Sequence, residues 1–216
     1  SSSGRLALNG GGSSTGAFSV VPGSTIAFTG GTFTVNAGSV FATTGGAYQI
    51  NGGIVVVPTA VAVTIPDLSL VTGSSYLAGS GDVTLTGTAV WSGGSMGHAA
   101  HTGGRTIVAA GSTLVMDGAV TYMYLDHGRT LTNNGAIEYT PTYAGYVYNQ
   151  STIDNAGTFT IRNENINSAG TTPNVFMNRA ASRGPAAADA RRRPRTGSRW
   201  ASGPCVARWR SRSQSG

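Results

Sequence analysis

Three Asn residues recur at a nearly constant spacing in the second half of the chain. Asn155 follows Asn133 by 22 residues, and Asn178 follows Asn155 by 23. Each Asn adjoins a short run of β-forming residues, and the first two are followed two positions on by Gly. A repeat of this length, built from strand and turn residues, is typical of one coil of a β-solenoid.

A second pair of segments gives the same repeat length. Gly23–Phe28 and Gly111–Met116 both read Gly-Ser-Thr followed by apolar residues, and they lie 88 residues apart, which equals four coils of 22. A β-sandwich also has many short strands, but its strands need not recur at a fixed coil length. The two spacings together therefore favour a solenoid.

The composition of residues 1–178 agrees with this prediction. Gly, Ser, Thr, Ala, Val and Asn dominate, and Gly and Asn disfavour helices whereas Thr and Val favour strands. Apolar and hydroxyl residues alternate in Thr32–Val35 and Val83–Leu85, as in strands with one buried face. We predict an all-β fold, a right-handed parallel β-helix with about seven or eight coils of about 22 residues.

Stacked coils explain the choice of residues. Strands of successive coils lie about 4.8 Å apart, so each residue sits above its equivalent in the previous coil. Corners need positive φ angles or side chains that bond their own backbone, which selects Gly and Asn. We expect Asn133, Asn155 and Asn178 to stack as a structural amide ladder.

Four segments carry a resemblance to known proteins: Gly79–Gly87, Val90–Met96, Ala109–Leu114 and Gly128–Gly135. With them, residues 16–178 resemble bacterial secreted parallel β-helix repeat proteins of the adhesin and autotransporter-passenger type. The resemblance implies a structural or adhesive segment of an exported surface protein, located outside the cell or on the bacterial surface. It implies no catalytic, cofactor-binding or metal-binding residues and no cofactor. Glycans or surface proteins of a host or of the environment are the partners it suggests.

The alternative is a carbohydrate-active β-helix enzyme, either a polysaccharide lyase or a hydrolase. Asp117, Asp126, Glu138, Arg105 and Arg129 are the charged residues that such a site would use. Glycoside hydrolysis needs two carboxylates about 5–10 Å apart. Two of these acids facing one groove would therefore indicate an enzyme, whereas Arg129 is also suited to tether a turn or a neighbouring coil.

Two further groups of residues are candidates for binding. His98, His101 and His127, with Asp126, are of the types that bind zinc, but His98 and His101 lie in a Gly-bounded loop, which favours solvated histidines over a metal site.

The tyrosines form two pairs, Tyr122 with Tyr124 and Tyr146 with Tyr148, and each pair is spaced to share one face of a strand. Exposed, these rings would contact glycans or a partner; otherwise they pack against the coils.

The chain changes character after Asn178. Residues 1–178 have a net charge of −3 and no Cys, whereas residues 179–216 have a net charge of +9 and contain Cys205. We predict that residues 179–216 are disordered, since they are rich in Arg and Pro and poor in apolar residues. A basic arm that binds nucleic acid through Arg, Trp200 and Trp209 is one interpretation. Because the change falls within a repeat, we favour out-of-frame sequence, and we expect no nucleic acid partner for the body.

No apolar run approaches the roughly 20 residues of a transmembrane helix, so no membrane span is expected. The chain begins at Ser1 with neither Met nor a signal sequence, and it reads as an interior fragment of a longer protein.

Overall fold

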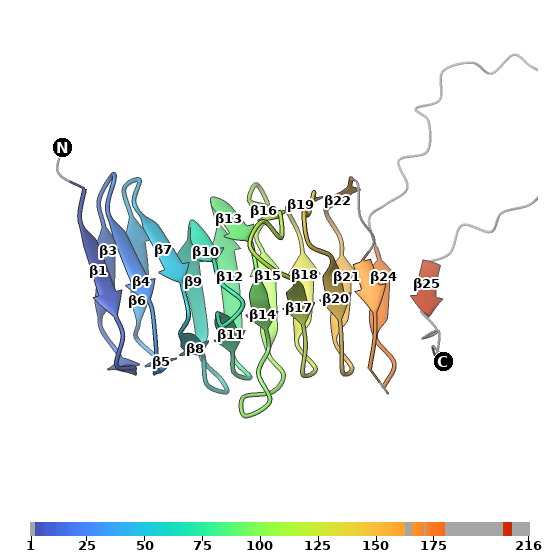
Figure 1. The fold of residues 1–216 in the computed structure, drawn as a ribbon, viewed down its shortest axis with the longest axis horizontal. Helices are drawn as coiled ribbons and strands as arrows, with labels where there is room; N and C mark the ends of the chain where they lie inside the picture. Colours follow the sequence, from blue (N-terminus) through green and yellow to red (C-terminus); the bar gives the residue numbers. More distant parts are fainter. Residues whose placement is uncertain (1–2, 163–165, 171, 180–204, 209–216) are drawn as a thin grey trace, which may run out of the picture.

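The protein is a β-solenoid in which short strands of successive coils lie side by side along one long axis (Figure 1). The structure, a computed structural model, describes residues 3–162, 166–170, 172–179 and 205–208. All regular secondary structure in these residues is strand, as the composition predicted. In this part of the chain, no helix occurs that is long and apolar enough to cross a membrane.

Each coil contributes one strand to each of three faces built from parallel strands, and the described residues make eight coils. We number the sheets in the order in which a coil passes through them. Sheet 1 consists of β1 (Arg5–Leu8), β4 (Thr25–Phe28), β7 (Ala47–Ile50), β10 (Leu68–Leu70), β13 (Thr88–Trp91), β16 (Thr113–Met116), β19 (Ala136–Tyr139) and β22 (Thr158–Ile161). Sheet 2 consists of β2 (Gly12–Ser14), β5 (Thr32–Val35), β8 (Ile54–Val56), β11 (Tyr76–Ala78), β14 (Gly94–Met96), β17 (Met123–Leu125), β20 (Gly145–Val147) and β23 (Ile166–Ser168).

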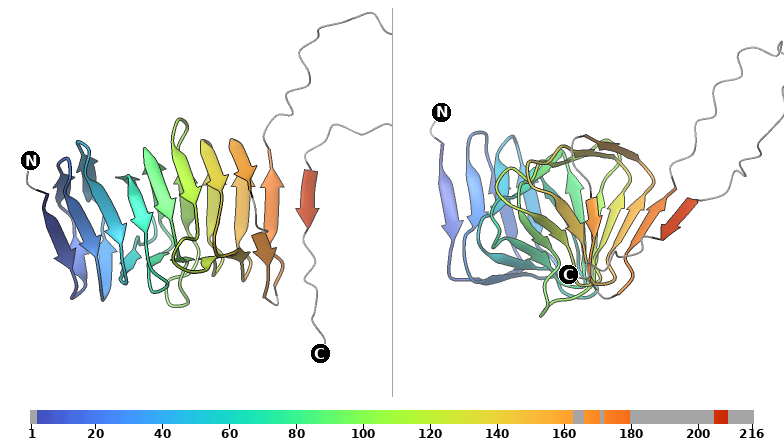
Figure 2. Two further views of the ribbon diagram at one scale, coloured as in Figure 1. Left: turned by 45° about the horizontal axis from the view of Figure 1, so that its top comes forward. Right: turned by 45° about the vertical axis from the view of Figure 1, so that its right-hand side comes forward.

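Sheet 3 is the third face of the coils. Its parallel strands are β9 (Ala62–Pro66), β12 (Asp82–Thr86), β15 (Arg105–Val108), β18 (Thr130–Asn133), β21 (Thr152–Asn155) and β24 (Val175–Asn178). In the first two coils the corresponding strands, β3 (Ala17–Val20) and β6 (Val40–Thr43), pair with each other. Two further views show the sheets closing around a common interior (Figure 2).

The repeat predicted from the sequence is confirmed by the strand register. Thr25 in β4 pairs with Ala47 in β7, and Thr88 in β13 pairs with Thr113 in β16. Four coils therefore separate Thr25 from Thr113 in the order of sheet 1. The two Gly-Ser-Thr segments begin equivalent strands.

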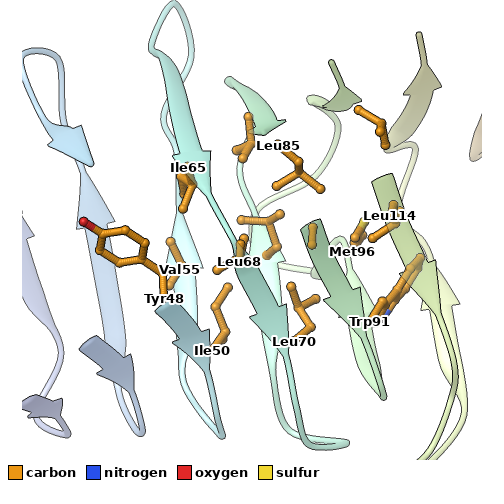
Figure 3. Packing of buried hydrophobic residues seen from close by; sticks show 14 of the residues in the cluster. Tyr48, Ile50, Val55, Ile65, Leu68, Leu70, Leu85, Trp91, Met96 and Leu114 are labelled. Atoms are coloured by element: carbon orange, nitrogen blue, oxygen red, sulfur yellow. The ribbon is translucent and has the colours of Figure 1, made fainter. Parts of the chain in front are cut away.

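The interior is filled by columns of apolar side chains, one from each successive coil (Figure 3). In sheet 1, Leu70 lies next to Trp91 in the strand order, and Trp91 pairs with Met116. All three side chains are buried. Full burial of a side chain of this kind contributes about 1.5–3 kcal/mol, so the columns are the main source of stability.

Coil length is not constant along the solenoid. Asn155 follows its register partner Asn133 by 22 residues. Between β14 and β17, however, Ser95 and Tyr124 are register neighbours 29 residues apart. The additional residues lie in two corner loops, 97–104 and 117–122, which join strands without interrupting the stacking. These loops carry or flank His98, His101, Tyr122 and Tyr124.

The end of sheet 3 differs from the prediction. The sequence has no strand pattern after Asn178, yet Cys205–Arg208 form β25, which pairs antiparallel with β24. The last coil of a solenoid leaves unpaired N–H and C=O groups at its edge, and a segment of almost any sequence can pair with them when extended. The predicted disorder and out-of-frame origin of the remaining tail concern residues 180–204 and 209–216, which lie outside the described residues.

Candidate functional site

Five tyrosines form a continuous network of ring contacts on the outer face of sheet 2. We call this network the tyrosine patch, and it consists of Tyr122, Tyr124, Tyr143, Tyr146 and Tyr148. Tyr124 in β17 and Tyr146 in β20 are register partners. Their rings are stacked, with centroids 5.6 Å apart and planes 19° apart. The stacking of coils thus places rings from two coils in direct contact.

Tyr122 and Tyr148 flank this stacked pair, and Tyr143 contacts Tyr122. The ring of Tyr148 lies 5.8 Å from that of Tyr124 and 5.7 Å from that of Tyr146. Tyr122 meets the rings of Tyr143 and Tyr146 edge to face, each at 5.6 Å. Such offset and edge-to-face pairs contribute roughly 0.5–1.5 kcal/mol each beyond the area they bury.

The five tyrosines of the patch differ in solvent exposure. Tyr124, Tyr146 and Tyr148 are half-buried, and burial raises the pKa of Tyr124, with smaller contributions from neighbouring tyrosines. Tyr122 and Tyr143 are 43% and 42% exposed. The ring surface available to a ligand therefore belongs mainly to these two residues.

Tyr143 was not among the tyrosines predicted from the sequence. It lies in the corner before β20 rather than on a strand, so the i, i+2 spacing that identified the two tyrosine pairs could not find it. Tyr139, by contrast, is a core residue: its ring is fully buried and its hydroxyl accepts a hydrogen bond from the N–H of Gly145 at 2.7 Å.

The two loops that present Tyr122 and Tyr143 are joined by backbone hydrogen bonds. Thr142 N–H donates to the carbonyl of Asp117 at 2.8 Å, and Tyr143 N–H donates to that of Gly118 at 3.1 Å. The carbonyl of Tyr122 accepts from the N–H of Gly94 in the preceding coil at 3.2 Å. The exposed rings are therefore held by ordered loops.

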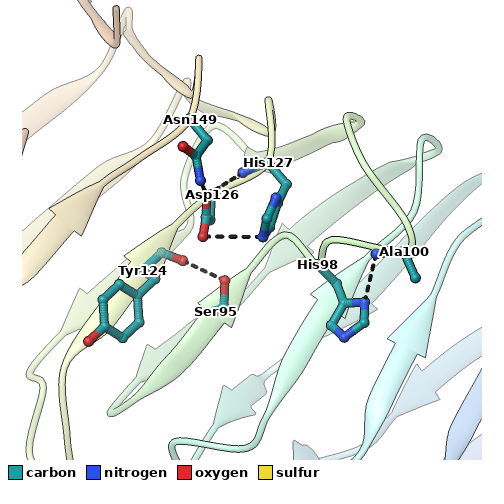
Figure 4. Close-up of polar contacts among 7 residues, drawn as sticks. All are labelled: Ser95, His98, Ala100, Tyr124, Asp126, His127 and Asn149. Carbon is teal, nitrogen blue, oxygen red and sulfur yellow. Dashed lines mark hydrogen bonds and ion pairs between the residues drawn. The ribbon is translucent and has the colours of Figure 1, made fainter. Parts of the chain in front are cut away.

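The corner between sheets 2 and 3 contains His98, His127 and Asp126 (Figure 4). Oδ1 of Asp126 accepts hydrogen bonds from His127 N–H at 2.6 Å and from Nδ2 of Asn149 at 2.8 Å, and Oδ2 lies 3.4 Å from Nε2 of His127. His127 and Asn149 have positive φ angles of 54° and 47°. Asp126 thus links His127 and Asn149, which have left-handed backbone conformations at equivalent corners of successive coils.

His98 faces a different set of partners. Its Nδ1 accepts from the N–H of Ala100 at 3.2 Å, and its ring meets that of Tyr76 edge to face at 4.9 Å. Burial lowers the pKa of His98, and the nearby His101 and His127 lower it further. No group of three or more His, Cys, Asp or Glu residues in the described ranges is arranged to hold a metal ion.

Of the three acids considered for catalysis, Asp117 and Glu138 lie near each other at one edge of sheet 1, whereas Asp126 lies at another corner of the coil. Asp117 follows β16 at the corner between sheets 1 and 2, and its carboxylate accepts from Ala119 N–H at 3.2 Å. Asp126 lies at the corner between sheets 2 and 3, and Glu138 lies on the exposed face of sheet 1. Arg105 does not approach any of them, because its Nε donates to Asp82 at 2.9 Å. This hydrogen bond lowers the pKa of Asp82.

Arg129 is a buried tether between coils. Its guanidinium donates from Nε to Oγ1 of Thr106 at 2.8 Å and from Nη2 to the carbonyl of Arg105 at 3.0 Å. Its Nη1 donates to the carbonyls of Gly79 at 2.9 Å and Gly103 at 3.3 Å. Burial lowers the pKa of Arg129 to about 10, so it stays protonated at neutral pH. One side chain thus connects three consecutive coils.

The three Asn residues of the sequence repeat lie in one column. Asn133, Asn155 and Asn178 end β18, β21 and β24 and are register partners. Nδ2 of Asn133 donates to Oδ1 of Asn155 at 2.6 Å, and Nδ2 of Asn155 donates to Oδ1 of Asn178 at 2.9 Å. Asn133 also accepts from Gly135 N–H at 3.1 Å. The column satisfies the buried amides of Asn133 and Asn155, and Asn178 is its exposed end.

A scan against protein-family models found no match, and neither did searches of the curated proteins and of the solved structures. The fold and the placement of its side chains are therefore the observations from which a function is inferred.

We predict that Arg129→Met lowers the free energy of unfolding by about 2–4 kcal/mol, because each buried acceptor left without a donor costs about 1–3 kcal/mol. Urea unfolding followed by circular dichroism measures the change. Arg105→Met is the matched control, since Arg105 lies one coil away in an exposed ion pair, which contributes at most about 1 kcal/mol. Equal losses for the two variants would contradict the tether.

We predict that Asn155→Ala lowers the free energy of unfolding by about 1–3 kcal/mol, because it interrupts the amide column between Asn133 and Asn178. Asn134→Ala serves as the control: Asn134 is exposed in the neighbouring turn, and its replacement should change stability by no more than about 0.5 kcal/mol. A stability for Asn155→Ala equal to that of the parent chain would show that the column does not stabilise the fold.

Proposed function

We propose that this chain is a structural or adhesive segment of an exported bacterial surface protein, and that it does not itself catalyse a reaction. The observation that carries the proposal is the eight-coil solenoid, in which the buried side chains of Arg129, Asn133 and Asn155 are hydrogen-bonded within the protein. Each coil of about 22 residues adds about 4.8 Å to the length of the rod. Such a chain is suited to hold other parts of a protein at a distance.

The chemistry of the interior supports a structural role. Arg129 binds backbone carbonyls, the Asn column binds itself, and Asp126 binds the corner residues next to it. These are the groups from which a catalytic site would be assembled, and here they fasten coils together. Their hydrogen bonds increase rigidity along the axis, which a spacer requires.

Export is supported by the composition and by the way solenoids fold. Residues 1–178 have no Cys and few charged residues, which suits a chain that crosses an envelope unfolded. In a repeat protein, each coil needs only its neighbours, so folding can begin anywhere and proceed along the chain. The resemblance to adhesins and autotransporter passengers agrees with folding after export.

The alternative, a polysaccharide lyase or hydrolase, has less support. A glycoside hydrolase needs two carboxylates about 5–10 Å apart across the substrate. Asp126 lies at a different corner from Asp117 and Glu138, and the Asp117 carboxylate accepts a hydrogen bond from Ala119 N–H in its own loop. We therefore favour the structural or adhesive function.

We predict that the solenoid is displayed outside the cell. Brief protease treatment of intact cells that carry the gene, followed by mass spectrometry, should release peptides from residues 3–162, and a cytoplasmic enzyme should remain uncut in the same cells. Peptides that appear only after lysis would contradict export. Degradation of a neutral or an acidic polysaccharide by the purified chain would contradict the absence of catalysis.

A further inference from the structure

Two neighbouring corner loops expose apolar side chains together. Val120, Tyr122 and Tyr143 are three of the seven large hydrophobic residues found exposed in the described part of the chain, and they lie in the corners before β17 and β20. We propose that Tyr122, Tyr143 and Val120 are the contact residues of a binding site for a neutral glycan. This inference rests on the proposed adhesive function and names the ligand class.

The arrangement of the rings separates contact residues from positioning residues. Tyr124 and Tyr146 stack on each other, so they cover part of each other's faces. Tyr122 is turned by 75° from Tyr146 and by 73° from Tyr143, and Tyr122 and Tyr143 keep large exposed areas. The half-buried rings of Tyr124 and Tyr146 therefore act as a base that holds Tyr122, and Tyr122 in turn contacts Tyr143.

The site is ordered before a ligand arrives. The hydrogen bonds from Thr142 and Tyr143 to the loop of the preceding coil fix both corners, and Val120 N–H donates to the carbonyl of Ser92 at 3.0 Å. A Tyr side chain has only two rotatable χ angles, so fixing it on binding costs little entropy. Preorganisation of this kind raises affinity without any additional contact.

The exposed area fits a few sugar rings better than a protein. A Tyr side chain offers about 150–250 Å² in all, so two rings exposed by about two fifths, with Val120, present roughly 200–300 Å². A stable protein interface buries about 800 Å² on each partner. The C–H face of a pyranose ring is apolar and packs against the electron-rich face of an aromatic ring.

The charge of the surface selects a neutral ligand. None of the eight strands of sheet 2 contains Asp, Glu, Lys, Arg or His. Binding of nucleic acids or acidic polysaccharides depends on Lys and Arg along the contact surface. Near the patch, Thr142 precedes Tyr143 and Asn167 is the register partner of Tyr146, and both are neutral. The charged group of the loop that carries Tyr122 is Asp117, an anion, which would repel an acidic polymer. Hydroxyl and amide groups both donate and accept hydrogen bonds, as sugar hydroxyls require.

The test is capture of the whole chain by insoluble neutral polysaccharides, namely cellulose, chitin and β-1,3-glucan. Sodium chloride at about 0.5 M shortens the Debye length to roughly 4 Å and suppresses charge binding by the Arg-rich tail. We expect at least one polymer to retain the chain, and we expect the double variant Tyr122→Ala, Tyr143→Ala to bind at least tenfold more weakly. The double variant Tyr122→Phe, Tyr143→Phe should keep most of the binding, because it keeps both rings.

Tyr76→Ala is the matched control, since Tyr76 is a half-buried ring of the same sheet that contacts His98 and lies outside the patch. It should bind like the parent chain, and all variants should show similar thermal unfolding midpoints. Failure of the parent chain to bind any neutral polymer, or unchanged binding by the double Ala variant, would overturn the site. Retention only by an acidic polymer such as alginate would overturn the ligand class. Each of these results leaves the structural spacer standing if the solenoid is displayed outside the cell.

Discussion

The parallel, in-register stacking of coils is the constraint on which the rest of this structure depends. Because side chains alternate along a strand, a slip of one residue between coils would exchange the buried and exposed faces of every strand in a sheet. Stacking also places each residue above its equivalent, which makes columns of apolar side chains possible. In sheet 3 the column of Ile65, Leu85 and Val108 continues directly into Asn133 and Asn155. At this position, successive coils are thus held together by apolar contacts in one part of the column and by amide hydrogen bonds in the next.

The same constraint explains where the chain is free to vary. Strands must stay in register, but a corner loop of any length is acceptable if it returns to the correct position. The loops 97–104 and 117–122 use this freedom, and the second of them presents Val120 and Tyr122 beside Tyr143. A rod with a fixed interior and a variable surface loop combines length with binding, which are the two properties that an adhesive spacer needs.

The sequence was informative wherever residues repeat and less so at the corners. The Asn spacing predicted the coil length, and the alternation in Thr32–Val35 predicted β5 with its bounds. The reach of Arg129 over two earlier coils and the entry of Tyr143 into the patch were not predictable, because both depend on loop paths that no periodicity encodes. β25 pairs with the edge of sheet 3 at β24, and the residues of Cys205–Arg208 carry no repeat from which this pairing could be predicted.

Disulfide trapping of register partners tests the stacking most directly. Glu138 and Thr160 are partners in β19 and β22, so their Cα atoms lie about 4.8 Å apart, within the range of a disulfide. In a chain with Cys205→Ser, the pair Glu138→Cys and Thr160→Cys should cross-link under mild oxidation. Glu138→Cys with Thr158→Cys is displaced by two residues, about 8 Å apart, and should remain reduced. Equal cross-linking of both pairs, or preferential cross-linking of the displaced pair, would contradict the register and with it the solenoid.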